Sequence, residues 1–205
     1  MSNYPLKDAG LTPYRVIKKV RHLSGPGKSI AIIGLGGLGF YGMQHAKILG
    51  QGSVVIGIDR NEKRVQDIGK ANLVDHALSI SSHVPDIREQ ITRITGKGVD
   101  VVLDCVSAEN TIRDAFRILN KGGALMAVGM FGNEVRIPLV PAIVNEYQVQ
   151  FSLWGNYNEL CEVIELAKQD KISHSVQEFP LSEINKVADM LRNGEIKGRA
   201  VIVPK

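Results

Sequence analysis

The sequence contains few cysteines, and their positions exclude two kinds of cysteine-based structure. Only Cys105 and Cys161 occur among 205 residues, and they lie far apart with no Cys-x-x-Cys pair. A zinc site built from cysteines alone needs closely spaced pairs, and a disulfide framework needs several cysteines. We therefore expect neither, and we interpret both cysteines as packing residues, Cys161 in the core.

Long apolar runs and strong net charge are also missing. No segment approaches the length of a membrane-spanning helix, and the N-terminal residues lack the charged and apolar regions of a signal peptide. The net charge is +4, and basic residues cluster only modestly, at Lys18, Lys19, Arg21 and Lys28. We interpret that cluster as a solvated face. The prediction is a cytoplasmic protein with no membrane and no nucleic-acid partner.

The chain does contain a glycine-rich turn between two apolar segments. Residues 30–33 form a short, continuously apolar run, which is typical of a strand buried on both faces. A Gly-x-Gly-x-x-Gly motif follows at residues 34–39, and residues 37–50 have helical periodicity. A second apolar strand at residues 54–58 ends at Asp59. This order and spacing predict a dinucleotide-binding unit.

Each part of that unit has a physical role in binding a dinucleotide. Gly34 allows a tight turn, Gly36 lets the backbone approach a pyrophosphate, and Gly39 permits close packing of helix and strand. The helix that opens at Gly37 and Leu38 offers free N–H groups to phosphate charge. Asp59 can accept hydrogen bonds from the ribose hydroxyls. The alternative is a generic strand–loop–helix whose glycines, and whose acid, fall there by chance.

Strands and helices alternate along the rest of the chain. Further strands are expected at residues 74–77, 99–104, 124–129 and 147–153, and helices at 61–70, 85–95, 110–119 and 159–168. This alternation predicts an α/β fold, a doubly wound parallel sheet (Rossmann dinucleotide-binding domain) with a short C-terminal appendage. Ligands of such sheets bind at the carboxyl ends of the strands. Those ends are Gly34, Asp59, Asp104–Val106, Val128–Met130 and Trp154–Asn156.

The flanking segments complete the expected organisation. Thr12 and Pro13 predict a helix start, with Thr12 as the N-cap and Pro13 at the first helical position. A turn is expected at residues 121–123, a helix at 183–192 and a closing strand at 197–203. The predicted division is a connector helix at 1–24, a Rossmann NAD-binding domain at 25–172 and a C-terminal segment at 173–205. None of the five histidines has metal-ligand spacing, so we expect structural or surface roles.

With these segments placed, the chain resembles the cofactor-binding half of the zinc-dependent medium-chain alcohol dehydrogenases, particularly archaeal and bacterial secondary-alcohol types. The resemblance rests on residues 5–14, the glycine motif, and residues 129–132, 153–155, 159–160 and 198–204. It implies NAD as cofactor, a small alcohol or ketone as the parent enzyme's substrate, and a homo-oligomer formed through an edge strand within residues 148–153. It also implies a catalytic domain that this sequence does not contain, so zinc is not expected in this chain alone.

The resemblance also implies roles for individual residues. Asp8 falls at the family's last catalytic-zinc ligand, and carboxylate oxygen is an acceptable ligand. Thr12 matches a residue beside the nicotinamide, Trp154 matches the strand end that lines its pocket, and Arg199 matches an arginine that reaches the pyrophosphate. Each has a structural alternative: a loop or cap for Asp8, a helix cap for Thr12, a core position for Trp154 and a solvated surface for Arg199.

The adenosine end has its own candidates. Arg60 is implied to stack on the adenine, whereas Arg64 either assists there or lies on a solvated helix face. Asp59 would repel a 2′-phosphate, so NAD is preferred over NADP. The strand-end residues Val106, Val128 and Gly129 complete the expected cofactor contacts.

These features predict the NAD(H)-binding part of a zinc-type alcohol dehydrogenase, inactive as this chain alone. One alternative is a zinc-free quinone or enone reductase of the same superfamily, which usually prefers NADP. Another is a stand-alone NAD-binding or sensing module. The apolar faces of the segment from Ser173 onward, without the missing domain, are expected to be exposed or repacked.

Overall fold

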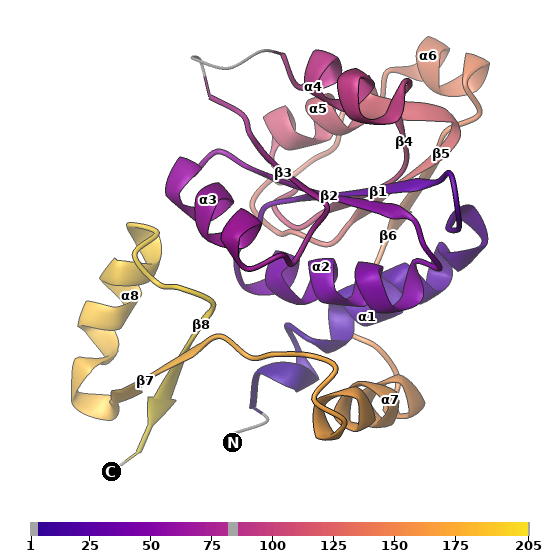
Figure 1. The fold of residues 1–205 in the computed structure, drawn as a ribbon. Coiled ribbons are helices and arrows are strands. Elements are labelled where there is room, and N and C mark those ends of the chain that lie inside the picture. The colour runs from indigo at the N-terminus through magenta and orange to yellow at the C-terminus, as the bar shows by residue number, and fades with distance from the viewer. Residues whose placement is uncertain (1–3, 82–85, 205) are drawn as a thin grey trace.

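A six-stranded parallel sheet forms the centre of the fold in the computed structural model, which describes residues 4–81 and 86–204 (Figure 1). The strand order is β3-β2-β1-β4-β5-β6, so the chain changes direction across the sheet at β1. This arrangement confirms the predicted doubly wound α/β fold. The strands are β1 (Ser29–Ile33), β2 (Val54–Asp59), β3 (His76–Ser79), β4 (Val99–Asp104), β5 (Leu119–Ala127) and β6 (Gln148–Phe151).

Helices cover both faces of this sheet. Ile30 and Ile32 of β1 pack on one face with α1 (Leu11–Lys19), α2 (Gly37–Leu49) and α3 (Glu62–Lys70). Ala31 and Ile33 pack on the other face with α4 (Ile87–Thr95) and α5 (Glu109–Ile118). Because successive strand residues point to opposite faces, burial on both sides explains why β1 is apolar at every position after Ser29.

A second, smaller sheet lies apart from the first. Strands β7 (Val176–Pro180) and β8 (Arg199–Val203) pair in parallel and are joined through α8 (Ile184–Arg192), as Figure 1 shows. Helix α7 (Tyr157–Lys168) precedes this unit and packs with α1 and α2. As expected, apolar side chains of this tail stay exposed, among them Leu181 and Leu191.

The remaining helices are short. They are α6 (Leu139–Val144), η1 (Tyr4–Lys7), η2 (Arg21–Leu23) and η3 (Leu181–Glu183). None of the helices within residues 4–81 and 86–204 combines the length and the apolar character needed to cross a bilayer.

The start of α1 corrects one prediction. The helix begins at Leu11 with Gly10 as its N-cap, so Thr12 lies inside the first turn and the predicted Thr12 cap is wrong. Gly10 already has helical angles, and the Thr12 hydroxyl instead accepts a hydrogen bond from the Trp154 N–H at 3.1 Å. In contrast, Asn61 at the start of the predicted 61–70 helix is the N-cap of α3, and its side chain accepts from the Arg64 N–H.

The predicted turn at residues 121–123 lies within β5 rather than before it. Gly122 has a positive φ of +72°, and its N–H donates to the Asn145 carbonyl at 2.7 Å. The strand therefore begins at Leu119 and absorbs the turn as a shift in its register with β4. Strand β3 begins at His76, two residues later than predicted.

Cys161, strand β7 and helix α6 also differ from what the sequence predicts. Cys161 is exposed rather than in the core, because it lies two residues from the buried Val163 and so on another face of α7. Strand β7 and helix α6 were not predicted, since both are short and β7 is only half-buried. The predicted helix start at residue 85, and the histidine at position 83, lie outside the described residues.

His45 occupies a structural position on α2. Its ring is fully buried, contacts the rings of Tyr14 and Tyr41, and places Nε2 2.9 Å from the Gly10 carbonyl. Burial lowers the pKa of His45 to about 4, although the Gly10 carbonyl opposes that shift. His45 is therefore neutral in the folded protein near pH 6.

This buried ring predicts a pH-dependent loss of stability. The unfolded chain binds a proton at His45 near pH 6.5, whereas the folded chain does so only near pH 4. The contribution of neutral His45 to the free energy of unfolding is thus fully present above pH 6.5. It falls by up to about 1.4 kcal/mol per pH unit as the pH drops toward 4. Urea unfolding at several pH values should show this slope. His45→Gln should reduce it, and His22→Gln, at an exposed site, should preserve it; an unchanged slope in His45→Gln contradicts the assignment.

Candidate functional site

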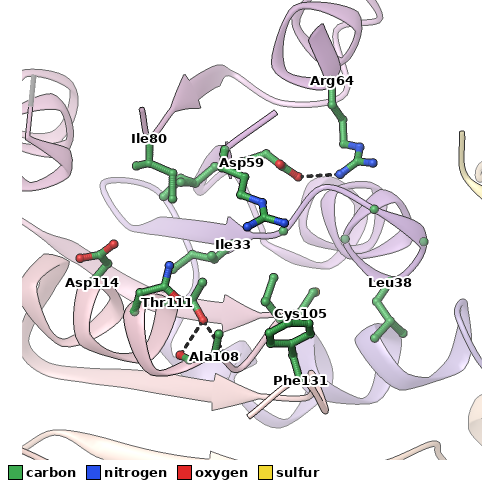
Figure 2. A pocket seen from close by; sticks show the side chains of 18 of the residues that line it. Ile33, Leu38, Asp59, Arg64, Ile80, Cys105, Ala108, Thr111, Asp114 and Phe131 are labelled. Atoms are coloured by element: carbon green, nitrogen blue, oxygen red, sulfur yellow. Dashed lines mark hydrogen bonds and ion pairs between the residues drawn. The ribbon is translucent and has the colours of Figure 1, made fainter. Parts of the chain in front are cut away.

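A cleft of about 580 Å³ opens at the carboxyl ends of β1, β2 and β4 (Figure 2). This volume is ordinary for a site that holds a cofactor-sized molecule. The lining includes most of the sequence-predicted cofactor residues, namely Gly34, Gly36, Gly37, Leu38, Gly39, Asp59, Arg60, Arg64, Val106 and Arg199. The fold therefore brings together predicted residues that are up to 165 positions apart, from Gly34 to Arg199.

The three motif glycines lie in three different surroundings. Gly34 has a φ of +86°, which favours glycine. A Cβ at Gly39 would stand 1.9 Å from the Gly34 carbonyl oxygen, so close contact of helix and turn requires glycine there. A Cβ at Gly36 would meet nothing within 4 Å, and its φ is −76°. Packing and backbone strain therefore do not require Gly36 to be glycine, whereas close approach of a ligand would.

Asp59 lies at the end of β2 and holds the turn in place. Its side chain is 7% exposed, and Oδ2 accepts from the Leu35 N–H at 2.8 Å. The other oxygen, Oδ1, accepts from the Asn61 N–H at 2.9 Å. Arg64 forms an ion pair with Oδ2 at 3.2 Å, which Figure 2 shows at one end of the cleft. The carboxylate thus joins the glycine turn to the start of α3.

Asp104 plays the corresponding part at the end of β4. Its fully buried carboxylate accepts from the N–H groups of Val106 and Ser107, both at 2.8 Å, and lies 2.7 Å from the Thr111 hydroxyl. Burial raises the pKa of Asp104, against the opposing effect of these hydrogen bonds. The side chain therefore shapes the loop that carries Val106 into the cleft.

Arg199 reaches the cleft from the second sheet. A guanidinium nitrogen donates to the Asp8 carboxylate at 2.9 Å. A Cβ at Gly37 would lie 2.7 Å from Arg199 Cδ, so the arginine rests on the first turn of α2. The arrangement places a cation at a helix N-terminus, where an anionic ligand is already favoured.

Four of the predicted cofactor contacts lie outside the cleft lining. Thr12 and Trp154 meet through the hydrogen bond described above, and Trp154 is 58% exposed rather than a core residue. Val128 is buried, and a Cβ at Gly129 would stand 2.1 Å from the Val106 backbone. These residues build the neighbouring strand ends. Asp8 is likewise outside the lining and touches it through Arg199.

Part of the cleft wall was not predicted from the sequence. The first turns of α5 contribute Asn110, Thr111 and Asp114, and the flat apolar part of the wall comes from Ile33, Ile58 and Ile80. The signal was available, since residues that follow a strand end in a parallel sheet face the same edge. Cys105 also lines the cleft, where burial and the nearby Asp104 raise the pKa of its thiol, so it is not a thiolate near neutral pH.

Comparison with known proteins identifies relatives of this chain. A family model described as zinc-binding dehydrogenase matches residues 37–169. An NAD-dependent alcohol dehydrogenase of Sulfurisphaera tokodaii is 34% identical over 203 residues, which are 98% of this chain and 57% of that protein. The chain thus spans little more than half the length of the curated relatives it matches.

Solved structures with a similar fold also cover nearly all of this chain. The alcohol dehydrogenase of Aeropyrum pernix superposes with a TM-score of 0.90 at 37% identity, over 98% of this chain and 57% of that one. Acetophenone reductase from Geotrichum candidum, solved in complex with NAD, superposes with a TM-score of 0.82 at 27% identity, over 97% of this chain and 54% of that one.

The contrast between two glycines gives a stability prediction. Gly39→Ala should lower the free energy of unfolding by about 1–3 kcal/mol, because its Cβ collides with the Gly34 carbonyl. Gly36→Ala should change it by no more than about 0.5 kcal/mol, because the added methyl meets only open space. Chemical denaturation measures both. Equal destabilisation by the two substitutions would contradict this geometry.

Proposed function

The chain belongs to the zinc-binding dehydrogenase family, and on that premise we propose that it is the NAD(H)-binding part of an oxidoreductase that acts on alcohols. One observation carries the proposal: Gly36 borders open space in the same cleft that contains Asp59. A backbone free of side chain beside a carboxylate is what a dinucleotide needs for its diphosphate and its ribose. The similarity to NAD-dependent alcohol dehydrogenases supports the same reading.

In this proposal the cleft holds the cofactor by its polar parts. The diphosphate lies on the N-terminal turn of α2 with Gly37, Leu38 and the Arg199 cation beside it. Asp59 accepts from the adenosine ribose and disfavours a 2′-phosphate, so NAD is preferred over NADP. Arg60 and Arg64 serve the adenosine side, and Val106 contacts the cofactor from the β4 loop.

NAD supplies a hydride acceptor at its nicotinamide ring. Thr12, Val128, Gly129 and Trp154 are proposed to form the nicotinamide end, where the Thr12 hydroxyl fixes the Trp154 backbone. The substrate of the whole protein is proposed to be a small alcohol or ketone. We propose that this chain alone orients the cofactor without catalysing turnover. Its proposed division is a connector at 1–24, a nucleotide domain at 25–172 and a tail at 173–205.

The described residues of this chain form no cluster of side chains that would fit a zinc ion by themselves. Among residues 4–81 and 86–204, no three histidine, cysteine, aspartate or glutamate side chains gather as possible ligands. Asp8, at the position that the resemblance assigns to a ligand, accepts instead from Arg199. The described donor set thus offers no zinc site.

We also propose that two copies associate through the β6 side of the sheet. Strand β6 is an edge strand, and an uncovered edge tends to pair. The neighbouring α6 has exposed apolar side chains, with Val140 at 70% and Ile143 at 66%. Exposed apolar groups on the helix that precedes an edge strand support self-association.

Binding of NADH tests the cofactor proposal. Purified protein should bind NADH with stoichiometry near one in calorimetry. Gly36→Ala should weaken that binding at least about tenfold, because its methyl occupies the space of the diphosphate. The control is Gly69→Ala on α3, away from the glycine motif, where the added methyl makes an ordinary contact with Ala77. This variant should bind NADH as tightly as the parent chain does.

NADPH and an activity assay decide between the alternatives. NADPH should bind more weakly than NADH, and a preference for NADPH would favour the zinc-free reductase. No heat with either dinucleotide would refute the proposal. Oxidation of alcohols by the isolated chain in the presence of a chelator would refute only its inactivity.

Light scattering tests the association. The solution mass should be twice the 22.4 kDa of one chain. Ile143→Glu should shift it to the mass of one chain, because it places a charge in the proposed contact. Leu191→Glu, at a similarly exposed position on α8, should leave the dimer intact. A parent protein that is monomeric at all concentrations measured rules the dimer out.

A further inference from the structure

Asp114 is a carboxylate in the cleft wall that the proposed function does not yet use. It projects from α5, and its side chain is only 16% exposed. Figure 2 shows it at the end of the cleft away from Leu38, on the same side as Ile80. A carboxylate placed in a largely apolar wall is costly to desolvate unless something there interacts with it.

The partners of Asp114 leave part of it available. Oδ1 faces Arg113 Nε at 3.9 Å and Arg117 NH1 at 3.6 Å, both too long for good hydrogen bonds. Arg117 makes its shorter ion pair with Asp86, at 2.6 Å, so its contact with Asp114 is the weaker of the two. Both ion pairs are made by Oδ1, so the carboxylate keeps acceptor capacity for a group bound in the cleft that Asp114 lines.

Neighbouring polar groups cannot take the same role. The Thr111 hydroxyl is committed, since it lies 2.7 Å from Asp104 Oδ2 and accepts from the Ala108 N–H. Asn110 is exposed at the rim, and its amide can donate as well as accept, so it does not distinguish an amine from a carbonyl oxygen. Between Asp59 and Asp114 the wall is formed by isoleucines, which suit the flat face of a base.

We infer that Asp114 determines base specificity by accepting a hydrogen bond from the 6-amino group of the adenine. This inference rests on the proposed function, since it requires a dinucleotide in the cleft with its ribose at Asp59. A base held by its ribose projects its 6-position away from Asp59, toward the α5 wall. An amine at that position donates to the carboxylate, whereas a carbonyl oxygen there would face it acceptor to acceptor. Asp114 is thus a specificity residue for 6-aminopurine over 6-oxopurine dinucleotides.

The experiment compares NADH with its hypoxanthine analogue, in which an oxygen replaces the 6-amino group. Calorimetric titration of the parent chain should show NADH binding at least about fivefold more tightly than the analogue. The 6-amino group of NADH donates a hydrogen bond to the Asp114 carboxylate, whereas the 6-oxygen of the analogue is an acceptor that faces another acceptor. Asp114→Ala should bring the ratio of the two affinities close to one. Asp114→Asn should also reduce it, because the amide can donate to the oxygen.

The affinity ratio separates specificity from simple damage, since a structural defect weakens both ligands equally. Glu109→Gln, on the same helix but outside the cleft lining, should keep the parent ratio. Thermal unfolding of each variant checks that it folds. Equal affinities in the parent chain, or an unchanged ratio in both Asp114 variants, would overturn this inference alone. Absence of NADH binding to the parent would instead overturn the proposed function, and this inference with it.

Discussion

The cleft depends on one carboxylate, that of Asp59, which accepts backbone N–H groups from two loops at once. Leu35 belongs to the glycine turn after β1, and Asn61 opens α3 after β2. Because a single buried side chain holds both, the turn keeps its position relative to the neighbouring strand end. Hydrogen bonds to a charged acceptor are stronger than those between neutral groups. The glycines permit the turn, and Asp59 fixes where it lies.

The same arrangement recurs at β4, so the binding edge of the sheet is shaped by strand-end carboxylates. Asp104 accepts from Val106 and Ser107 and contacts the Thr111 hydroxyl, which orders the loop and the first turn of α5. The two acids differ in environment. Asp59 has the Arg64 cation beside it, whereas Asp104 is fully buried and relies on neutral donors. Each strand end thus supplies a carboxylate whose hydrogen bonds order the adjoining loops.

Local patterns in the sequence predicted the sheet and the central part of the cleft. Strands β1 and β4 are buried at every position, so their mostly apolar sequences indicate strands without reference to distant contacts. Thr12 was misread because its hydroxyl bonds to Trp154, which is 142 positions away and invisible to a local capping rule. Asp114 was missed because the order of the elements indicates only that α5 follows the end of β4, and not which of its side chains faces the cleft. The Asp8–Arg199 pair joins the two ends of the chain, and only the family resemblance placed both residues near one site.

Arg199 also sets how the cleft is bounded. The floor is made by the six-stranded sheet, but this part of the rim comes from β8, in a sheet that shares no strand with it. Ion pairs connect the tail to the body, Arg199 with Asp8 and Lys197 with Asp67, and both are partly exposed to solvent. Such pairs weaken as ionic strength rises. Added salt should therefore weaken the ion pairs at the mouth of the cleft, whereas the apolar packing of its floor does not depend on them.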